Sequence, residues 1–66
     1  MWNNKTIKPF KGKMVEVTYK TKINTNVLTG EISASTKYHI LFNVNRTGTE
    51  ISLKYNQITN IQKPSK

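Results

Sequence analysis

A chain of 66 residues forms one domain with a small core, since a domain of this size buries only about 60% of the surface that its unfolded chain exposes. The sequence has no cysteine and one histidine, which excludes a disulfide scaffold, argues against a metal centre and leaves oligomerisation as the remaining supplement to stability. Lys and Arg number 11 against 3 acidic residues, and the resulting net charge of +8 favours a polyanionic partner, because each neutralised phosphate releases condensed counterions.

The positive charge has a structural alternative. Lysines can keep a β-rich protein soluble and blunt the edges of its sheet without binding nucleic acid. An anionic membrane surface is less well supported, because the sequence contains no amphipathic basic helix. No apolar run approaches the roughly 20 residues of a membrane span, and no signal-peptide core follows the first four residues, so we expect a soluble, cytoplasmic protein.

Residues 1–13 are expected to form an N-terminal arm. Pro9 suits the first position of a helical turn, but Gly12 would end such a helix within one turn, so we expect an arm rather than a helix. Trp2 could stack on a base, yet large aromatic residues near a terminus usually pin it down. We therefore expect Trp2 to cover an open end of the fold.

Residues 14–44 carry the pattern of three strands. Residues 14–19 alternate between apolar and polar and predict the first strand. The segment 20–26 is polar and lacks an Asn-Gly pair, which predicts a longer loop or a hairpin whose tip lies near Asn24. Residues 28–44 predict a β-hairpin, and Gly30 in its first strand indicates a bend, a bulge or a close backbone approach.

The remaining residues predict two further strands. Gly48 can supply the positive φ angle of a turn, after which residues 49–55 alternate as a fourth strand. Ile58 and Ile61 are three residues apart, a spacing that predicts a single 3₁₀ turn leading into a short last strand. Residues 62–66 are expected to be a tail.

Five short strands without a long helix predict an all-β domain, either a small barrel or two curved sheets. Closure of the strands would bury their apolar faces together. The expected core consists of Val15, Val17, Leu28, Ile32, Ile40, Phe42, Ile51, Leu53, Ile58 and Ile61. Met14 and Leu41 lie on the opposite face of this pattern, so some apolar surface is left for the arm or for a neighbouring subunit.

The central hairpin and the last strands resemble a known family. The run Leu28-x-Gly30-x-Ile32, followed by Ser35-Thr36-Lys37-Tyr38 and Ile40-Leu41-Phe42, is similar to the first signature of the Sm and Lsm superfamily, especially its bacterial branch, the Hfq proteins. Residues 53–61 resemble the second signature, a hydrophobic strand that leads into a short turn and an isoleucine pair. Other small SH3-like barrels share many of these positions.

The likeness covers about residues 15–61. It implies a five-stranded, strongly bent SH3-like or Sm-like barrel at residues 14–61, rings of six or seven identical subunits, and single-stranded RNA bound around the pore. The chain departs from the family at Thr36, where an aspartate is usual, and at Lys54-Tyr55, where Sm proteins carry Arg-Gly.

By analogy with this family, two loops would face the pore and bind RNA. Their candidate RNA-binding residues are Lys37, Tyr38, Lys54, Tyr55, Asn56 and Gln57. Tyrosine rings stack on bases with about 1–3 kcal/mol per base, amides read base edges and lysines hold phosphates. Tyr38 and Tyr55 could instead be strand-end core residues with solvated hydroxyl groups. Arg46 could hold a phosphate bidentately from its turn, or be an ordinary solvated turn residue.

The sequence names no reaction. Glu16, Glu31 and Glu50 are expected on outward faces of different strands, whereas an acid/base dyad needs two carboxylates in one pocket. Without cysteine, aspartate, a glycine-rich phosphate loop or a metal-spaced cluster, we expect no enzyme, no cofactor and no metal site. His39 is expected to be a structural or surface residue.

Our first hypothesis from the sequence is therefore a homo-oligomeric, Sm-like protein that binds single-stranded RNA. The alternatives are an SH3-like adaptor barrel that binds a protein partner and a small basic barrel that binds DNA.

Overall fold

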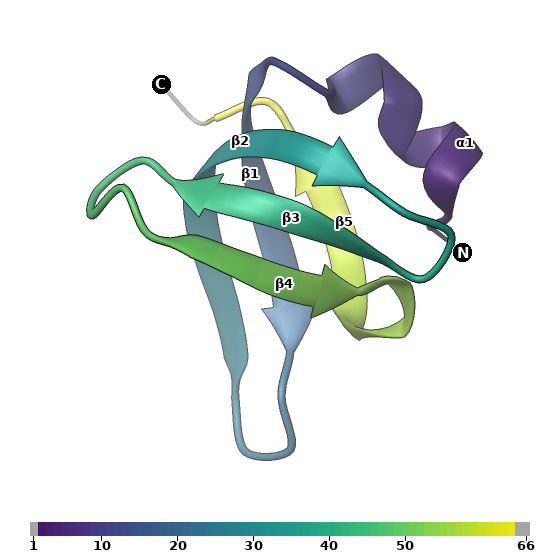
Figure 1. Ribbon diagram of the computed structural model, residues 1–66. Helices are drawn as coiled ribbons and strands as arrows, with labels where there is room; N and C mark the ends of the chain where they lie inside the picture. Colours follow the sequence, from purple (N-terminus) through teal and green to yellow (C-terminus); the bar gives the residue numbers. More distant parts are fainter. Residues whose placement is uncertain (1, 65–66) are drawn as a thin grey trace.

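The computed structural model describes residues 2–64 and consists of one antiparallel sheet with short helical turns (Figure 1). Its elements are α1 (Asn4–Ile7), the 3₁₀ turn η1 (Lys8–Phe10), β1 (Met14–Lys20), β2 (Thr25–Ser35), β3 (His39–Val44), β4 (Glu50–Lys54), the 3₁₀ turn η2 (Tyr55–Gln57) and β5 (Ile58–Gln62). The strand order is β4-β3-β2-β1-β5. The end of the predicted tail, Ser65 and Lys66, lies outside the described residues.

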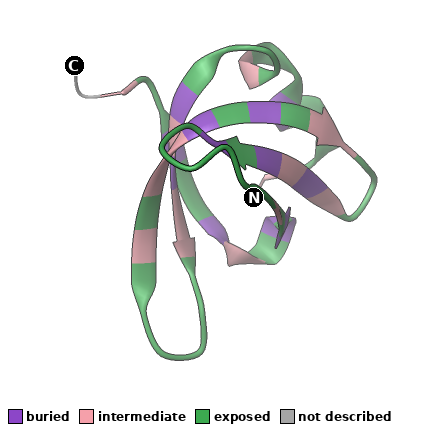
Figure 2. Cartoon of the chain, turned by 60° about the vertical axis from the view of Figure 1, so that its left-hand side comes forward, coloured by how far each residue is buried: buried purple, intermediate pink, exposed green. Residues whose placement is uncertain are grey.

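The sheet is strongly curled, and its concave side encloses the core (Figure 2). Its edge strands β4 and β5 do not pair with each other, so the sheet is not closed. In β3 the inward residues Ile40, Phe42 and Val44 are buried while Asn43 between them is exposed. The predicted all-β fold with five strands and a strong bend is confirmed, because alternation of period two directs every second side chain to the concave face.

Two β-bulges interrupt this alternation. Ser33 is the extra residue where the β2–β3 register shifts, and its hydroxyl donates to the Leu41 carbonyl at 3.2 Å. Thr59 is the extra residue in the β1–β5 ladder. The bulge lets Ile58 and Ile61 both face the core from within β5. The 3₁₀ turn predicted from their spacing therefore lies earlier, at η2.

Gly30 lies where the backbones of β2 and β3 cross closely. A Cβ atom there would overlap the Asn43 carbonyl oxygen and come within 3.0 Å of the Asn45 nitrogen. Of the three explanations that the sequence offered for this glycine, a close backbone approach is therefore present. The tight contact lies where the end of β3 pairs with the middle of β2.

The N-terminal segment contains a helical turn that begins at Asn4, and it also contains the single turn considered at Pro9, which is the 3₁₀ turn η1. The Asn3 side chain accepts hydrogen bonds from the Lys5 and Thr6 backbone nitrogens at 2.8 and 3.1 Å, and Thr6 Oγ1 accepts from the Asn3 nitrogen at 2.8 Å. This reciprocal cap stabilises a helix too short to persist alone. The expected arm is thus partly helical.

The helical turn places Ile7 inside the curled sheet, where its side chain is 0% exposed. Trp2 packs edge-on against Phe10 with ring centroids 5.8 Å apart, and both rings lie against the core. The covering role predicted for Trp2 is confirmed. The burial of Ile7 was not predicted.

The observed core agrees closely with the predicted one. Leu28 and Ile51 are only partly buried, Met14 is 38% exposed as its outward position predicted, and Val44 and Tyr55 join the core together with Ile7. Among the described residues, no helix has the length and apolar character needed to cross a membrane.

Candidate nucleic-acid interface

The turn between β2 and β3 lies directly against η2 at one end of the sheet. The Tyr55 hydroxyl donates to the Thr36 carbonyl at 2.7 Å, and the Tyr55 nitrogen donates to the Tyr38 carbonyl at 3.4 Å. An open hollow of about 540 Å³ forms between the two segments and is lined by Lys37, Tyr38, His39, Lys54, Tyr55 and Asn56. The two loops assigned to RNA by the resemblance therefore share one surface, called here the Tyr38 hollow.

Thr36 determines the shape of this turn. Its hydroxyl oxygen accepts hydrogen bonds from the backbone nitrogens of Tyr38 and His39, both at 3.1 Å, and its own backbone nitrogen donates to the His39 carbonyl at 2.8 Å. A threonine that bonds to its own turn in this way holds the two following side chains outward. Lys37 and Tyr38 are those two side chains.

Tyr38 is the most accessible aromatic group of the hollow. Its side chain is 71% exposed, and the Lys37 ammonium lies 5.9 Å from the ring centroid. The alternative in which Tyr38 is a core residue is therefore wrong. An exposed ring beside an ammonium group offers a stacking face and a phosphate contact at neighbouring points.

Tyr55 is a core residue instead. Its side chain is only 7% exposed, so the ring cannot stack on a base. Burial raises the pKa of the Tyr55 phenol, an effect that the Ser35 hydroxyl partly offsets. The fold therefore agrees with the alternative in which Tyr55 is a core residue. Its ring supports the hollow from below.

Gln57 also has a structural role. Its side-chain oxygen accepts a hydrogen bond from the Lys54 nitrogen at 3.0 Å, and its side-chain nitrogen lies 3.4 Å from the Lys20 carbonyl, to which it donates. Because both ends of the amide are engaged with backbone, Gln57 is not placed to read a base edge. Asn56 is exposed and lines the hollow, so it remains the candidate amide of this loop.

Arg46 lies away from the Tyr38 hollow. It belongs to the turn between β3 and β4, at the opposite end of β3 from Tyr38, and lines a separate small depression beside Val27 and Leu28 (Figure 1). Gly48 in this turn has a φ angle of +71°, as the sequence predicted. The structure therefore does not unite Arg46 with the other candidate residues.

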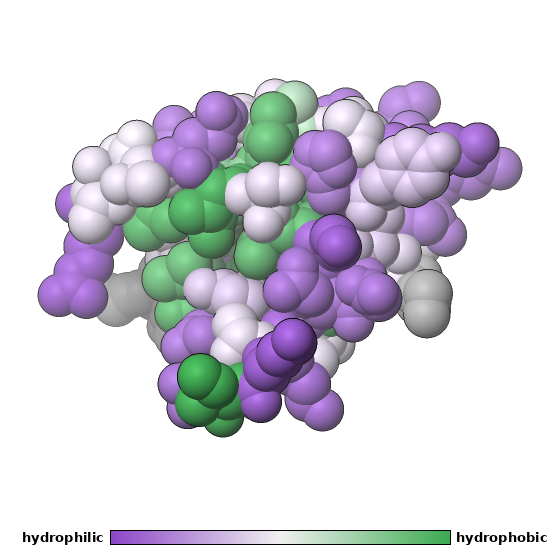
Figure 3. Space-filling model, turned by 60° about the horizontal axis from the view of Figure 1, so that its bottom comes forward, coloured by the Kyte–Doolittle hydropathy of each residue, from purple (hydrophilic) through white to green (hydrophobic). Residues whose placement is uncertain are grey.

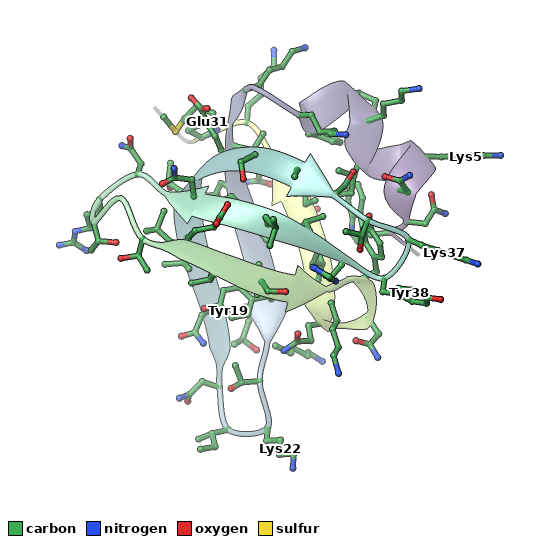
Figure 4. The ribbon with its side chains drawn as sticks, in the orientation of Figure 1. Lys5, Tyr19, Lys22, Glu31, Lys37 and Tyr38 are labelled. Atoms are coloured by element: carbon green, nitrogen blue, oxygen red, sulfur yellow. The ribbon has the colours of Figure 1, made fainter. Side chains whose placement is uncertain are left out.

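Lys5 was not among the sequence candidates, although it lies on the same side of the molecule as Lys37 and Tyr38 (Figure 4). Together with Asn3, Asn4 and Lys37 it lines a shallow depression next to the Tyr38 hollow. The Ser35 hydroxyl donates to the Asn4 side chain at 2.6 Å and ties the helical turn to the end of β2. The sequence signal for Lys5 was the Asn3-x-x-Thr6 capping pattern, which starts a helix at that point.

The carboxylates lie elsewhere on the sheet. Glu50 accepts a hydrogen bond from Ser33 at 3.0 Å, and Glu16 accepts one from Gln62 at 2.8 Å. Glu31 faces Met14 and Asn43 across its two ladders. Acidic residues therefore do not line the Tyr38 hollow.

His39 lies at the start of β3, with its Nδ1 3.2 Å from the Thr36 hydroxyl oxygen. Within residues 2–64, no group of three or more His, Cys, Asp or Glu side chains is arranged to hold a metal ion.

Comparisons with protein-family models, curated proteins and solved structures found no match to this chain.

Proposed function

We propose that this protein binds single-stranded RNA through the Tyr38 hollow, without catalysing a reaction. The observation that carries the proposal is the Tyr38 ring, 71% exposed at the rim of a concave surface whose charged groups are lysines. An exposed tyrosine ring offers a flat apolar face, and a nucleic-acid base has the matching face to stack on it.

Each group of the hollow has a chemical role in this proposal. The Tyr38 ring stacks on a base, while the ammonium groups of Lys37 and Lys54 contact the phosphates on either side. Asn56 offers both a donor and an acceptor to a base edge. Lys5 extends the basic surface beyond Lys37 and follows the backbone of the same strand.

We propose further that the protein acts as a homo-oligomer, as its resemblance to Sm and Hfq proteins implies. The strand order supports this, because β4 and β5 each keep one side without a partner strand in the described chain. Such edges pair readily with another chain. Pairing β4 of one subunit with β5 of the next would also enlarge a core that is small for a single chain.

Fluorescence anisotropy with labelled oligo(U) and oligo(A) over a salt series tests RNA binding. We expect binding that weakens as salt rises, with a slope of about 0.7 in log units for each phosphate contacted. Tyr38→Ala should weaken it by about 5- to 150-fold, the equivalent of about 1–3 kcal/mol per stacked base, while Tyr38→Phe retains it. The matched control is Val27→Ala, which removes another exposed apolar side chain far from the hollow. Absence of binding at low salt would refute the proposal.

A protein-binding adaptor is the second candidate, and one observation favours it. A largely apolar hollow of about 480 Å³ lies between η1 and the end of β5, lined by Pro9, Phe10, Met14, Val15 and Pro64 together with Lys13 and Lys63. A monomer that binds a peptide there with little dependence on salt would support this function over RNA binding.

Competition between RNA and duplex DNA in the anisotropy assay separates the third candidate, a DNA-binding protein.

A further inference from the structure

The β1–β2 hairpin repeats the turn that presents Tyr38. Residues Thr21-Lys22-Ile23-Asn24 correspond to Thr36-Lys37-Tyr38-His39 in sequence, each a threonine, a lysine, a large side chain and a polar residue. In both turns the threonine nitrogen donates to the carbonyl three residues later, at 2.7 and 2.8 Å.

The side-chain bonds are the same as well. Thr21 Oγ1 accepts from the Ile23 and Asn24 nitrogens at 3.3 and 3.0 Å. In the same way, Thr36 Oγ1 accepts from the Tyr38 and His39 nitrogens. The tip is thus a closed, hydrogen-bonded turn that holds Lys22 and Ile23 outward. Figure 4 shows Lys22 extending from this tip, remote from Lys37 and Tyr38.

Ile23 is 87% exposed, the highest value among the large hydrophobic residues described. The hairpin projects from the body of the protein (Figure 1), and from Lys20 to Val27 only Asn26 is even half-buried. In the view onto this end, hydrophobic atoms lie beside strongly hydrophilic ones (Figure 3). Burying such a side chain against a partner would contribute about 1.5–3 kcal/mol to binding.

We propose that this hairpin tip is a second contact for the same RNA strand. Ile23 packs on the face of a base, and Lys20 and Lys22 hold the adjacent phosphates. The inference rests on the proposed RNA binding and adds a site to it.

The chemistry around Ile23 selects a base rather than a membrane or a protein. One isoleucine buries four carbon atoms, about 3 kcal/mol at roughly 0.8 kcal/mol each, which is less than the marginal anchoring of a single acyl chain. Its neighbours in the turn are polar or basic, whereas a protein interface needs a wider apolar centre. A lone apolar group that follows two lysines in the same turn matches a base with its neighbouring phosphates.

Because the two turns lie apart, RNA oligonucleotides of different lengths can test whether both turns are contacted. They lie at opposite ends of β2, an 11-residue strand, in a molecule whose extents are 29 × 27 × 20 Å. Small nucleic-acid-binding domains cover from about 4 to about 16 nucleotides. An oligonucleotide of about 4 residues reaches only the Tyr38 hollow, and one of about 16 reaches both turns.

Anisotropy with oligo(U) of about 4 and about 16 nucleotides is measured for wild type, Ile23→Ser and Lys22→Ala. We expect Ile23→Ser to weaken binding of the longer oligonucleotide several-fold, and Lys22→Ala to lower the salt slope of that binding by about 0.7. Binding of the shorter oligonucleotide should be unchanged. The controls are Val27→Ser, an exposed apolar residue of the same hairpin, and Lys63→Ala, a like loss of charge elsewhere. Thermal unfolding checks that each variant is folded.

The outcomes separate the two proposals. If wild type binds neither oligonucleotide, RNA binding and the second contact both fall. If wild type binds and Ile23→Ser behaves like Val27→Ser on the longer strand, only the second contact falls. If Ile23→Ser keeps RNA binding but loses binding to vesicles of anionic phospholipid, the tip is a membrane contact and the inference is overturned.

Discussion

At the residue scale, the Thr36 hydroxyl decides how the Tyr38 hollow presents its aromatic ring. It accepts two backbone hydrogen bonds that no apolar side chain of the same shape could replace. The sequence identified Tyr38 and Lys37 as candidates but not the residue that positions them. The signal was present, because a threonine two residues before the exposed side chain is a known turn pattern.

We predict that Thr36→Val weakens RNA binding while the protein stays folded. Valine keeps the shape of threonine and loses the hydroxyl, so the turn gains freedom that must be removed again on binding. We expect a loss of about 3- to 10-fold in affinity, equivalent to about 1 kcal/mol. Thr47→Val, at the turn near Arg46, is the control, and equal effects of the two variants would contradict the positioning role.

Tyr55 predicts a pH dependence of stability. Burial raises the pKa of its phenol above the ordinary value of about 10, so the folded state favours the protonated form. The stability that this contributes is complete below pH 10 and is lost as the pH rises through the raised pKa. Tyr55→Phe should lower stability by about 1 kcal/mol at neutral pH, through the lost bond to Thr36, and should remove part of the alkaline decline.

Urea unfolding of wild type and Tyr55→Phe between about pH 8 and 11.5 measures this difference. Tyr38→Phe, which removes the hydroxyl of an exposed tyrosine, is the control variant. Parallel profiles of wild type and Tyr55→Phe would contradict the buried position of Tyr55.

At the scale of elements, strand alternation and turn residues predicted where the strands run and how they are joined, but not the bulges within them. Residues 14–19 and β3 alternate without interruption, and their inward residues were correctly assigned. Ser33 and Thr59 form bulges that break the alternation, and each bulge is closed by a hydroxyl bond to the partner strand, Thr59 to Thr18 at 3.1 Å. A bulge depends on the neighbouring strand, so a single strand's pattern does not reveal it.

The close approach of β2 and β3 at Gly30 can be tested by substitution. Gly30→Ala forces a methyl group against the Asn43 carbonyl, and the two backbones must separate to admit it. We expect a loss of about 1–3 kcal/mol, typical of overpacking, seen as a lower urea midpoint. Thr29→Ala, on the adjacent position of β2, should cost less than about 1 kcal/mol. A Gly30→Ala variant as stable as wild type would show that the strands are not held in this close approach.

At the scale of the whole molecule, the open sheet and the distribution of charge determine what the protein can bind. β4 and β5 leave two edges available, and the basic groups named at the two Thr-Lys turns lie at opposite ends of β2. Mass in solution by light scattering tests the proposed oligomer. We expect six or seven times the 7.6 kDa of one chain, the subunit number that the resemblance to Sm and Hfq proteins implies. A mass of one chain at every concentration would refute the ring but not RNA binding by the monomer.

The amino-acid sequence by itself determined the β-class, the approximate strands and most of the core, because alternation and glycine placement are local properties that each segment carries alone. It also identified the basic charge that favours a polyanion. Only the tertiary structure decided that Ile7 enters the core, that Tyr55 and Gln57 support the site while Tyr38 is exposed, and that Arg46 lies elsewhere. These outcomes depend on which segments the curled sheet brings together, and contacts between distant residues are not contained in the pattern of any one strand.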